Sequence, residues 1–427
     1  MTAIRTFAGL CAGLFLASCA TPATDPAPAL PAAEQPERVL LIGLDGLRPD
    51  MVERYGATHL QALAARGTTA EAMIPVMPSV TFVNFYSIAT GLYPQTHGMV
   101  TNAPYDSETG ETFVNGISTS DPKWWGGEPI WITAERQGLA TGVMFWLGSE
   151  TAIDGVRPTD WSPYEHEKPY QERVDTVLSW FDRLEEERPR FAAVYFDRVD
   201  TAGHAFGPED PRTAEAVAEV DDYVGQLVEG LRARGLLETT NIMVVSDHGM
   251  ARLDFNQTIN LDPLIDFDSV HAPEMEGRHG AGLRPFVTIF GEPGAIDAAH
   301  DALNGAHPHL QVWRRGETPE RFRFDHPTRG PDLFVLADVG WSLTAPSLVT
   351  SPRAAYPGVH GYDNAAPEMA ATFIGAGPRF DEGASAAPFE NVNLYAVMAC
   401  ALGLEPAQTD ADPAVVARLT GGRCSPD

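Results

Sequence analysis

Acidic residues and histidines, whose side chains bind divalent metal ions, occur in short clusters along this chain of 427 residues. A mixed set of Asp and His without cysteine suits zinc or another divalent first-row metal better than calcium, which prefers ligands that are all oxygen. We therefore predict a zinc centre. Its candidate ligands are Asp45, the pair Asp200 and His204, the adjacent pair Asp247 and His248, and His360 in the segment "GVHGYDN".

Each cluster also has an ordinary interpretation when it is taken alone. An Asp at the end of a strand commonly caps the following helix, and a single His is more often a core or surface residue. Asp200 and His204 are four residues apart in "DTAGH", so a helical turn would place both on one side of the segment. Three clusters that reach the same edge of a sheet support a metal centre more strongly than any one of them does.

Thr81 is the candidate nucleophile. It heads the segment Thr81 to Thr90, whose apolar residues are spaced for the buried face of a helix. A hydroxyl at the start of a helix can serve simply as the N-cap, and this alternative stays open. A helix start also offers free N–H donors to a phosphate, and an alcohol becomes a competent nucleophile when a metal or a base activates it. The sequence thus predicts that Thr81 attacks phosphorus.

The clusters follow apolar runs that are typical of buried parallel strands. "RVLLIGLDG" contains Asp45 near its end, "RFAAVYFDRVD" ends in Asp200, and "NIMVVSDHG" contains Asp247. Segments with helical periodicity, Glu172 to Glu186 and Glu209 to Arg234, lie between the strands. We expect an α/β fold with a mostly parallel central sheet and helices on both faces, in which ligands bind beyond the carboxyl ends of the strands.

Two stretches without a clear period, about Pro104 to Glu128 and Phe255 to Leu283, are interpreted as long loops that shape a binding site. A strand at "RPFVTIFG", a helix near Ala295 to Leu303 and a strand at "HLQVWRR" predict a small inserted α+β subdomain at about residues 255–355. The catalytic domain as a whole is expected over residues 38–427.

The N-terminal residues are typical of an export signal. A positive charge at Arg5 precedes roughly a dozen apolar residues, and "LASC" at Leu16 to Cys19 resembles the lipobox of bacterial lipoproteins. We predict a lipoprotein signal peptide over residues 1–18, membrane attachment through a lipidated Cys19, and an Ala/Pro-rich tether over residues 19–37. The expected location is periplasm-facing or in the outer membrane of a Gram-negative bacterium. A plain secretory signal that is cut elsewhere is the alternative.

Cys400 and Cys424 are the cysteines beyond the predicted signal. In an exported protein an even pair indicates one disulfide, which would pin the C-terminal tail, and two free thiols are the alternative. The formal net charge of −29 argues against binding of nucleic-acid duplexes or anionic membranes through general electrostatics. An anionic substrate must then be drawn in by local positive charge, which bound metal ions would supply. We expect a monomer that acts on a small phosphodiester.

Six motifs occur along the chain: "GLDGLRPD", "TFVNFYSIATGLYPQTHGMVTN", "WWGGEPIW", "DTAGHAFGP", "SDHGM" and "HGYDN". In their order and spacing they resemble the nucleotide pyrophosphatase/phosphodiesterase family of the alkaline phosphatase superfamily. The resemblance covers about Arg38 to Leu404 and looks like a bacterial single-domain member. It implies the three-layer α/β sandwich of alkaline phosphatase.

The resemblance implies two zinc ions (Zn²⁺) per chain and a role for each candidate. Thr81 matches the nucleophile, and Asn102 matches the residue that donates a hydrogen bond to a non-bridging phosphate oxygen. The residues that match the ligands of one zinc are Asp45, Thr81, Asp247 and His248, and those that match the ligands of the other are Asp200, His204 and His360.

The resemblance further implies an aromatic slot that stacks on a nucleobase or another leaving group. Phe82, next to the nucleophile, and Tyr164 match its stacking residues. The chain departs from the family at Val83, where proline is usual, and at Thr119, the approximate position of a lysine that some nucleotide-preferring members use near the base. The slot would be completed by Tyr195 and Val114, with Trp146 and Glu150 nearby.

The predicted function is cleavage of phosphodiester or pyrophosphate bonds through a covalent phosphothreonine on Thr81, with release of a nucleoside monophosphate. A choline-phosphodiester or phospholipid-cleaving relative is a close alternative, because only the leaving-group pocket separates it from a nucleotide enzyme. An alkaline phosphomonoesterase would need extra positive groups for a dianionic phosphate, and Asn102 disfavours it. The intact set of nucleophile and ligand candidates disfavours a non-catalytic binding lipoprotein.

Overall fold

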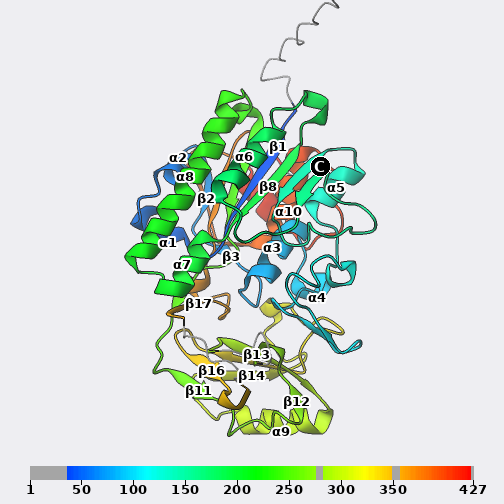
Figure 1. Ribbon diagram of the computed structural model, residues 1–427, viewed down its shortest axis with the longest axis vertical. Coiled ribbons are helices and arrows are strands. Elements are labelled where there is room, and N and C mark those ends of the chain that lie inside the picture. The colour runs from blue at the N-terminus through cyan, green and yellow to red at the C-terminus, as the bar shows by residue number, and fades with distance from the viewer. Residues whose placement is uncertain (1–35, 276–281, 349–355, 425–427) are drawn as a thin grey trace, which may run out of the picture.

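A computed structural model of the protein describes residues 36–275, 282–348 and 356–424, which are coloured in Figure 1. The predicted signal peptide, Cys19 and residues 19–35 of the predicted tether lie outside the described residues. Within the described ranges, no helix has both the length and the apolar character that crossing a membrane requires.

The centre of the fold is a sheet of eight strands. β18 is antiparallel to both of its neighbours, and all the other adjacent strands run parallel, as predicted for a mostly parallel sheet. In spatial order the strands are β19 (Ala384–Ala386), β2 (Gly67–Ala70), β18 (Phe373–Ala376), β9 (Thr240–Val245), β1 (Arg38–Leu44), β8 (Phe191–Phe196), β6 (Thr141–Met144) and β7 (Asp160–Ser162).

Helices cover both faces of this sheet (Figure 1). On one face α2 contacts β2 and β18, α6 contacts β8, and the long α8 packs against both helices. On the other face α10 contacts β1, and α3 and α5 pack beside it. This arrangement confirms the predicted three-layer α/β sandwich. The helices are α1 (Pro49–Arg54), α2 (Thr58–Ala65), α6 (Tyr170–Trp180), α7 (Arg198–Phe206) and α8 (Pro211–Ala233) on the first side, and α3 (Thr81–Thr90), α4 (Pro94–His97), α5 (Ile130–Arg136), α10 (Leu394–Leu402) and α11 (Pro413–Leu419) on the second.

The three strands that precede the acidic clusters are fully buried. All seven residues of β1 are buried, and so are all residues of its parallel neighbours β8 and β9. A strand that is covered on both faces needs apolar side chains on both, which explains why these segments lack a polar alternation. Because the three strands are parallel, their carboxyl ends lie at one edge of the sheet.

One predicted helix boundary is wrong. The helix expected over Glu172 to Glu186 is α6, and it ends at Trp180. A short 3₁₀ turn follows at Glu185–Glu187, and Glu185 forms an ion pair with the buried guanidinium of Arg38 at the start of β1. This long-range ion pair joins the turn after α6 to the start of β1.

Residues 258–344 contain a smaller antiparallel sheet, which lies beyond one end of the sandwich (Figure 1). α9 (Pro293–Leu303) packs on this sheet, and apolar side chains between Ile259 and Ala345 form a core of their own. A separate apolar cluster joins Phe286, Phe324 and Phe334 to Val80 and Val83 at the start of α3. The sheet has the order β12 (Val270–His271), β13 (Phe286–Gly291), β15 (Leu333–Ala337) and β14 (Leu310–Arg314), and β11 (Thr258–Asn260) pairs with β16 (Ser342–Thr344) nearby.

Three further strand pairs are short and lie in the connecting segments. The pair of β10 and β17 matters most for function, because β10 follows β9 and β17 directly precedes His360. The pairs are β3 (Met73–Ile74) with β20 (Phe389–Glu390), β4 (Tyr105–Asp106) with β5 (Glu111–Thr112), and β10 (Ala251–Arg252) with β17 (Gly358–Val359).

The C-terminal tail is tied to the sandwich by a disulfide. Cys400 of α10 is bonded to Cys424, and their Cα atoms are 5.8 Å apart. This confirms the predicted pairing and rules out the alternative of two free thiols. A covalent link of this kind restricts the unfolded chain and so stabilises the attachment of the tail.

Candidate active site

The ends of β1, β8 and β9 are locked together at the carboxyl edge of the sheet. Asp45 follows β1, Asp247 lies two residues after β9, and Asp200 lies in α7, which begins two residues after β8. The main-chain N–H of Asp200 donates to the carbonyl oxygen of Asp45 at 3.0 Å, and the N–H of Gly46 donates to Oδ1 of Asp247 at 3.1 Å. Gly46 has a φ of 73°, and a Cβ there would lie 3.0 Å from the Cα of Asp200. Glycine therefore allows this close approach.

The structure brings Asp45, Asp247 and His248 into one group. The Nε2 atom of His248 lies 2.9 Å from Oδ2 of Asp247 and 3.5 Å from Oδ1 of Asp45. One ligand atom from each of the three residues lies within 4.8 Å of the others, and all three side chains are buried. This spacing suits the shared coordination of a metal ion.

A second group lies directly beside the first. The Nε2 atom of His360 lies 3.2 Å from Nε2 of His204 and 3.6 Å from Oδ1 of Asp200. His204 and Asp200 share α7, as their spacing predicts, and Nε2 of His204 lies 3.4 Å from the same Oδ1. The rings of His360 and His248 stack with centroids 3.5 Å apart, which joins the two groups into one centre.

The three histidines are held with Nε2 directed into the centre. In each ring Nδ1 faces a main-chain carbonyl oxygen, so Nδ1 carries the proton and Nε2 keeps its lone pair for a metal. The carbonyl oxygens belong to Gly358 for His204 (2.8 Å), Gly249 for His248 (2.8 Å) and Ser79 for His360 (2.9 Å).

Three buried carboxylate oxygens in this centre accept no hydrogen bond of regular geometry from the described part of the chain: Oδ1 of Asp45, Oδ1 of Asp200 and Oδ2 of Asp247. Burial and the neighbouring charges of Asp247 and Asp200 raise the pKa of Asp45 well above its usual value, and burial raises the pKa of Asp200. A divalent cation would relieve this repulsion. Together with the free Nε2 atoms, these oxygens form a donor set that fits zinc.

Thr81 is positioned by a buried helix. It is the first residue of α3, whose residues Val83 to Thr90 are all buried. Val80 is the N-cap, and Oγ1 of Thr81 lies 3.3 Å from Nε2 of His248. The hydroxyl faces the metal centre, so the interpretation of Thr81 as a simple N-cap is wrong.

Asn102 lies beside the start of α3. Its Oδ1 accepts a hydrogen bond of 2.9 Å from the main-chain N–H of Phe82. Because the oxygen is engaged there, the Nδ2 group remains as a donor, and Asn102 lines the same cavity as Thr81. This geometry suits a hydrogen bond to an oxygen of a phosphate held next to Thr81.

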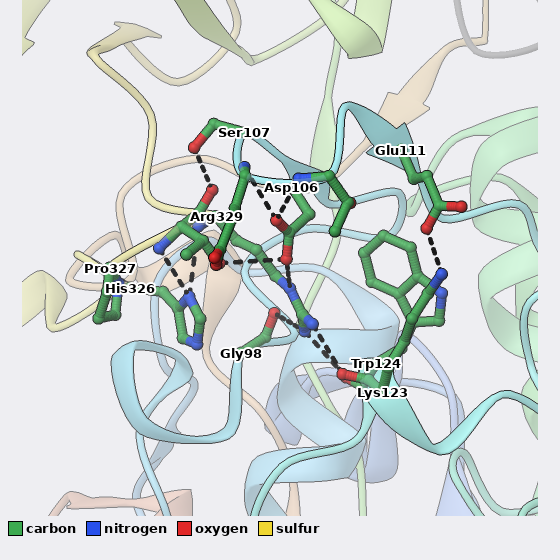
Figure 2. A network of polar contacts seen from close by, with 12 residues as sticks. Gly98, Asp106, Ser107, Glu111, Lys123, Trp124, His326, Pro327 and Arg329 are labelled. Carbon is green, nitrogen blue, oxygen red and sulfur yellow. Dashed lines mark hydrogen bonds and ion pairs between the residues drawn. The ribbon is translucent and has the colours of Figure 1, made fainter.

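Arg329 binds Gly98 and Asp106, as Figure 2 shows, and these two residues flank the segment that carries Asn102. Arg329 is 7% exposed, and its Nε donates to Oδ2 of Asp106 at 3.0 Å, four residues beyond Asn102. The subdomain that contains Arg329 is thereby tied to the segment of Asn102 and to the segment of Lys123 and Trp124. The guanidinium also donates to the carbonyl oxygens of Gly98 (3.2 Å), Trp124 (3.3 Å) and Lys123 (2.7 Å).

A cavity of about 190 Å³ opens beside Thr81. The ring of Tyr164 is partly exposed and packs edge-on against Tyr195, with centroids 6.1 Å apart. The hydroxyl of Tyr195 donates to Oδ2 of Asp45 at 2.5 Å, which connects the cavity wall to the metal centre. Of the residues predicted to bind substrate, those that line the cavity are Phe82, Trp146, Tyr164 and Tyr195, with Glu150 beside them.

One predicted lining residue lies elsewhere. Val114 is half-buried in a turn, where its N–H donates to Oγ of Ser118 at 3.1 Å, and among the described residues it is Asn115 rather than Val114 that lines the cavity. Trp125 belongs to the "WWGGEPIW" motif, and Phe145 directly follows β6. The sequence therefore carried a signal for both residues. The lining residues that sequence reasoning missed are Asn115, Trp125, Phe145, Leu147 and Gly148.

The family model for type I phosphodiesterase / nucleotide pyrophosphatase matches residues 39–363 of the chain. The protein belongs to this family. A Schizosaccharomyces pombe protein described as an uncharacterized pyrophosphatase/phosphodiesterase is 37% identical over 87% of this chain and 77% of its own length. The mouse bis(5'-adenosyl)-triphosphatase is 33% identical over 86% of this chain and 78% of its own length.

Solved structures of a phosphodiesterase of this kind share the fold. Murine ectonucleotide pyrophosphatase/phosphodiesterase 5 superposes with a TM-score of 0.83 at 29% identity, covering 90% of this chain and 100% of that one. A structure of its inactive threonine-to-alanine variant in complex with AMP gives a TM-score of 0.81 at 28% identity, covering 88% and 97%. The similarity confirms the alkaline-phosphatase-like fold.

Membership in the phosphodiesterase family confirms the predicted class of enzyme, a hydrolase of phosphodiester or pyrophosphate bonds. Thr119 lines the cavity. It stands at the approximate position where the resemblance implies a lysine in some nucleotide-preferring members. The Thr119 hydroxyl donates to Oε2 of Glu150 at 3.2 Å, and Oε1 of Glu150 accepts from the N–H of Tyr164 at 3.0 Å. Glu150 therefore bridges two segments of the cavity wall.

Proposed function

We propose that the protein is a two-zinc phosphodiesterase that cleaves nucleotide esters and anhydrides through a covalent phosphothreonine on Thr81 and releases a nucleoside monophosphate. The position of Thr81 carries this proposal. Its Oγ1 lies 3.3 Å from Nε2 of His248, at the border between the metal centre and the aromatic cavity. A nucleophile held there can reach a phosphorus atom whose nucleoside occupies the cavity.

The ligand atoms divide into two sets, which meet where the rings of His248 and His360 stack. When bound, zinc would acidify the Thr81 hydroxyl and neutralise negative charge on the phosphate oxygens. The residues that would hold one ion are Asp45, Thr81, Asp247 and His248, and those that would hold the other are Asp200, His204 and His360.

The side chains of the protein act directly on the substrate. The oxygen of Thr81 forms a bond to phosphorus while the bond to the leaving oxygen breaks; the hydroxyl proton goes to solvent, and solvent supplies a proton to the leaving oxygen. The Nδ2 group of Asn102 donates to a non-bridging oxygen, where charge builds up in the transition state. Water then attacks the phosphothreonine, which frees the nucleoside monophosphate and restores Thr81.

A nucleoside is the substituent that the cavity favours. Exposed aromatic rings such as Tyr164 stack on nucleobases, and Asn115 and Thr119 add polar groups at the wall. The relatives support this choice, since the murine protein binds AMP and the mouse enzyme is named for bis(5'-adenosyl) triphosphate. A choline group could also bind an aromatic cavity through cation–π contacts, so it belongs in the test.

The substrate class can be tested with chromogenic esters on zinc-loaded protein. We expect nitrophenol release to be faster from the nitrophenyl ester of a nucleoside monophosphate than from nitrophenyl phosphate, because the diester fills the cavity and places one negative charge beside Asn102. Faster release from nitrophenyl phosphate would contradict the diesterase proposal. Fastest release from the nitrophenyl ester of phosphocholine would favour the choline alternative.

The nucleophile can be tested with Thr81→Ala. Loss of the attacking oxygen should lower kcat by about 10³-fold or more, while the zinc content, measured by atomic absorption, is retained through the Asp and His ligands. Thr176→Ala, which removes a hydroxyl that donates to a carbonyl oxygen on the surface helix α6, is the matched control and should keep full activity. A fully active Thr81→Ala variant would remove Thr81 from the mechanism.

A further inference from the structure

Asn84 lies inside the motif that carries Thr81, and the proposed function leaves it without a role. It belongs to α3, three residues after Thr81, and its side chain is completely buried. Asparagine is unfavourable in the interior of a helix, and a buried amide costs free energy unless its polar atoms are hydrogen-bonded. The position of Asn84 therefore calls for a physical reason.

The amide of Asn84 makes every hydrogen bond that an asparagine side chain can make. Its Oδ1 accepts from the main-chain N–H of Val76 at 2.7 Å and from Nδ2 of Asn391 at 2.9 Å. Its Nδ2 donates to the carbonyl oxygens of Pro78 at 3.1 Å and Val80 at 3.0 Å. Both acceptor positions and both donor positions are thus filled. Three of these four partners belong to the loop directly before α3, so Asn84 binds this loop to the helix.

The loop of residues 75–80 ends at the nucleophile. Every residue of the loop is buried, so its main-chain polar groups need partners inside the protein. Val80 is the N-cap of α3, and its apolar side chain cannot supply the hydrogen bond that commonly fixes the start of a helix. Asn84 provides the equivalent restraint from inside the helix, because it binds the main chain on either side of Ser79.

The same loop is bonded to the segment that carries His360. The carbonyl oxygen of Ser79 accepts the Nδ1 hydrogen bond of His360 at 2.9 Å, and Oγ of Ser79 donates to the carbonyl oxygen of Tyr362 at 2.9 Å. Nδ2 of Asn364 donates to the carbonyl oxygen of Pro75 at 2.8 Å. The loop therefore connects α3 to the segment of His360.

Thr81 and His360 meet again at His248. Oγ1 of Thr81 lies 3.3 Å from Nε2 of His248, and the ring of His360 stacks on the ring of His248 with centroids 3.5 Å apart. The contacts thus form a closed circuit, which runs from Thr81 through Ser79 to His360 and returns through His248. In such a circuit the position of the loop determines where Thr81 stands relative to the metal centre.

We propose that Asn84 is a positioning residue, which sets the nucleophile Thr81 and the proposed metal ligand His360 at the correct distance from each other. The inference rests on the proposed function. Ser79 binds His360 and lies two residues before Thr81, so a displacement of the loop at Ser79 would move both groups. Because a misplacement of about 1 Å can cost about 100-fold in rate, the reaction requires a loop that is fixed.

Asn391 offers a comparison that separates positioning from stability. Its side chain is also completely buried, and it bonds to the same oxygen of Asn84. Within the described residues, however, the side chain of Asn391 makes no hydrogen bond to the loop of residues 75–80. A variant of Asn391 should therefore lower stability and leave the loop in place.

Asn84→Asp is the sharpest test, because it keeps the shape of the side chain and replaces the donor by an oxygen that faces two carbonyl oxygens of the loop. The repulsion should displace the loop. We expect kcat for the nitrophenyl ester of a nucleoside monophosphate to fall by about 100-fold while KM changes by less than about threefold, since Tyr164 and Tyr195 of the cavity lie on other segments. Asn84→Leu, which removes the amide without adding a charge, should act in the same direction.

Zinc retention provides a readout that does not depend on turnover. A displaced Ser79 carbonyl oxygen no longer orients His360, so both Asn84 variants should release one of the two zinc ions at a chelator concentration about tenfold lower than the wild type does. Ser79→Ala cuts the bond of the loop to Tyr362 and leaves Asn84 intact. It should also release this ion at a lower chelator concentration than the wild type does.

The matched control is Asn391→Ala. It removes the other donor to Oδ1 of Asn84, so the midpoint of urea denaturation should fall, as it does in Asn84→Leu. Because the bonds between Asn84 and the loop remain, kcat should stay within about twofold of the wild-type value and both zinc ions should be retained as in the wild type.

Three results would overturn the proposal. The first is a folded Asn84 variant that keeps wild-type kcat and zinc retention. The second is a loss of kcat in Asn391→Ala as large as in the Asn84 variants, which would show that stability alone is affected. The third, which applies where no Asn84 variant folds, is wild-type zinc retention in Ser79→Ala. If wild-type protein does not cleave the nitrophenyl ester, the proposed function is wrong, and zinc retention still decides whether the loop holds His360.

Discussion

Two clusters of buried charge lie close to the cavity, and they differ in how their atoms are partnered. In the metal centre, Asp45, Asp200 and Asp247 each keep one carboxylate oxygen without a hydrogen bond from the described residues. In the second cluster, drawn in Figure 2, Asp106 accepts hydrogen bonds from Arg329, Thr328 and two main-chain N–H groups. Both clusters are well shielded from water, so burial alone does not separate them.

The direction of the pKa shifts follows this difference. Burial and like charge raise the pKa of Asp45. Burial would also raise the pKa of Asp106, but its bonds to Arg329, Thr109, Thr328 and Glu108 lower the pKa below its usual value. The comparison teaches that buried carboxylates without partners mark a place for a cation from solution, whereas buried carboxylates with partners act as scaffold.

Asp45→Asn tests the unpartnered side of the comparison and should have the largest effect. Activity should fall by more than about 100-fold, the loss that even an outer partner of a metal ligand can cause. In protein stripped of metal by a chelator, the same substitution should raise the free energy of unfolding by about 1–3 kcal/mol, because it removes one of three neighbouring carboxylates. Nitrophenyl-ester kinetics and urea denaturation measure the two effects.

The matched control for this pair of measurements is Asp222→Asn, because the side chain of Asp222 is 76% exposed on α8. It should change the free energy of unfolding by less than about 0.5 kcal/mol and leave activity intact. A chelated Asp45→Asn protein that is less stable than the chelated wild type would show that the carboxylates do not repel one another, and would break the comparison.

Arg329→Met tests the partnered cluster. The substitution leaves the carboxylate of Asp106 buried without its cation, so the free energy of unfolding should fall by about 3–5 kcal/mol. Urea denaturation measures this loss. Because the same contacts hold the segment of Asn102, kcat for the nitrophenyl ester should also fall in protein that is still folded.

The double variant Asp106→Leu, Arg329→Met separates pairing from packing. Replacing both partners by apolar side chains should recover part of the stability lost in Arg329→Met, since no unpaired charge stays buried. Equal or greater instability of the double variant would mean that the ion pair contributes little and that the site depends on shape alone.

The sequence was sufficient for features that depend on local patterns. Asp45 and Asp247 follow apolar runs whose burial on both faces is visible in their composition, and the i, i+4 spacing of Asp200 and His204 predicts their shared helix. These patterns place Asp45, Asp200, His204, Asp247 and His248 at one edge of the sheet before any coordinates are known, whereas the role of His360 was implied by the resemblance to the family.

Contacts between distant segments could not be predicted in this way. Arg329 and Asp106 are 223 positions apart, and nothing near either residue indicates the other. Glu185, in the turn that follows α6, pairs with Arg38, which lies 147 positions away, and the helical periodicity of the segment does not indicate this partner. In each case the deciding partner lies outside the local pattern.

His97 extends the comparison to a buried group that stays neutral. Its Nε2 faces Oγ of Ser87 at 2.8 Å, and burial, with the positive fields of His326 and Arg329, lowers its pKa from 6.5 to about 3. Between these two pH values the unfolded chain binds a proton at His97 that the folded chain does not, so the contribution of His97 to the free energy of unfolding is fully present above pH 6.5 and is lost as the pH decreases. His97→Gln should flatten this dependence by up to about 1.4 kcal/mol per pH unit, measured by chemical denaturation at a series of pH values.

His326→Gln provides a graded counterpart to this variant. Burial and Arg329 lower the pKa of His326 to about 4, so the direction is the same, but the flattening should end about one pH unit higher than for His97→Gln, because the folded chain takes up this proton earlier. If the free energy of unfolding of His97→Gln depends on pH as steeply as that of the wild type, His97 must be charged in the folded protein. The cluster around Arg329 would then contain neighbouring cations whose repulsion lowers the free energy of unfolding. The complete partnering of its charged groups would no longer distinguish it from the metal centre.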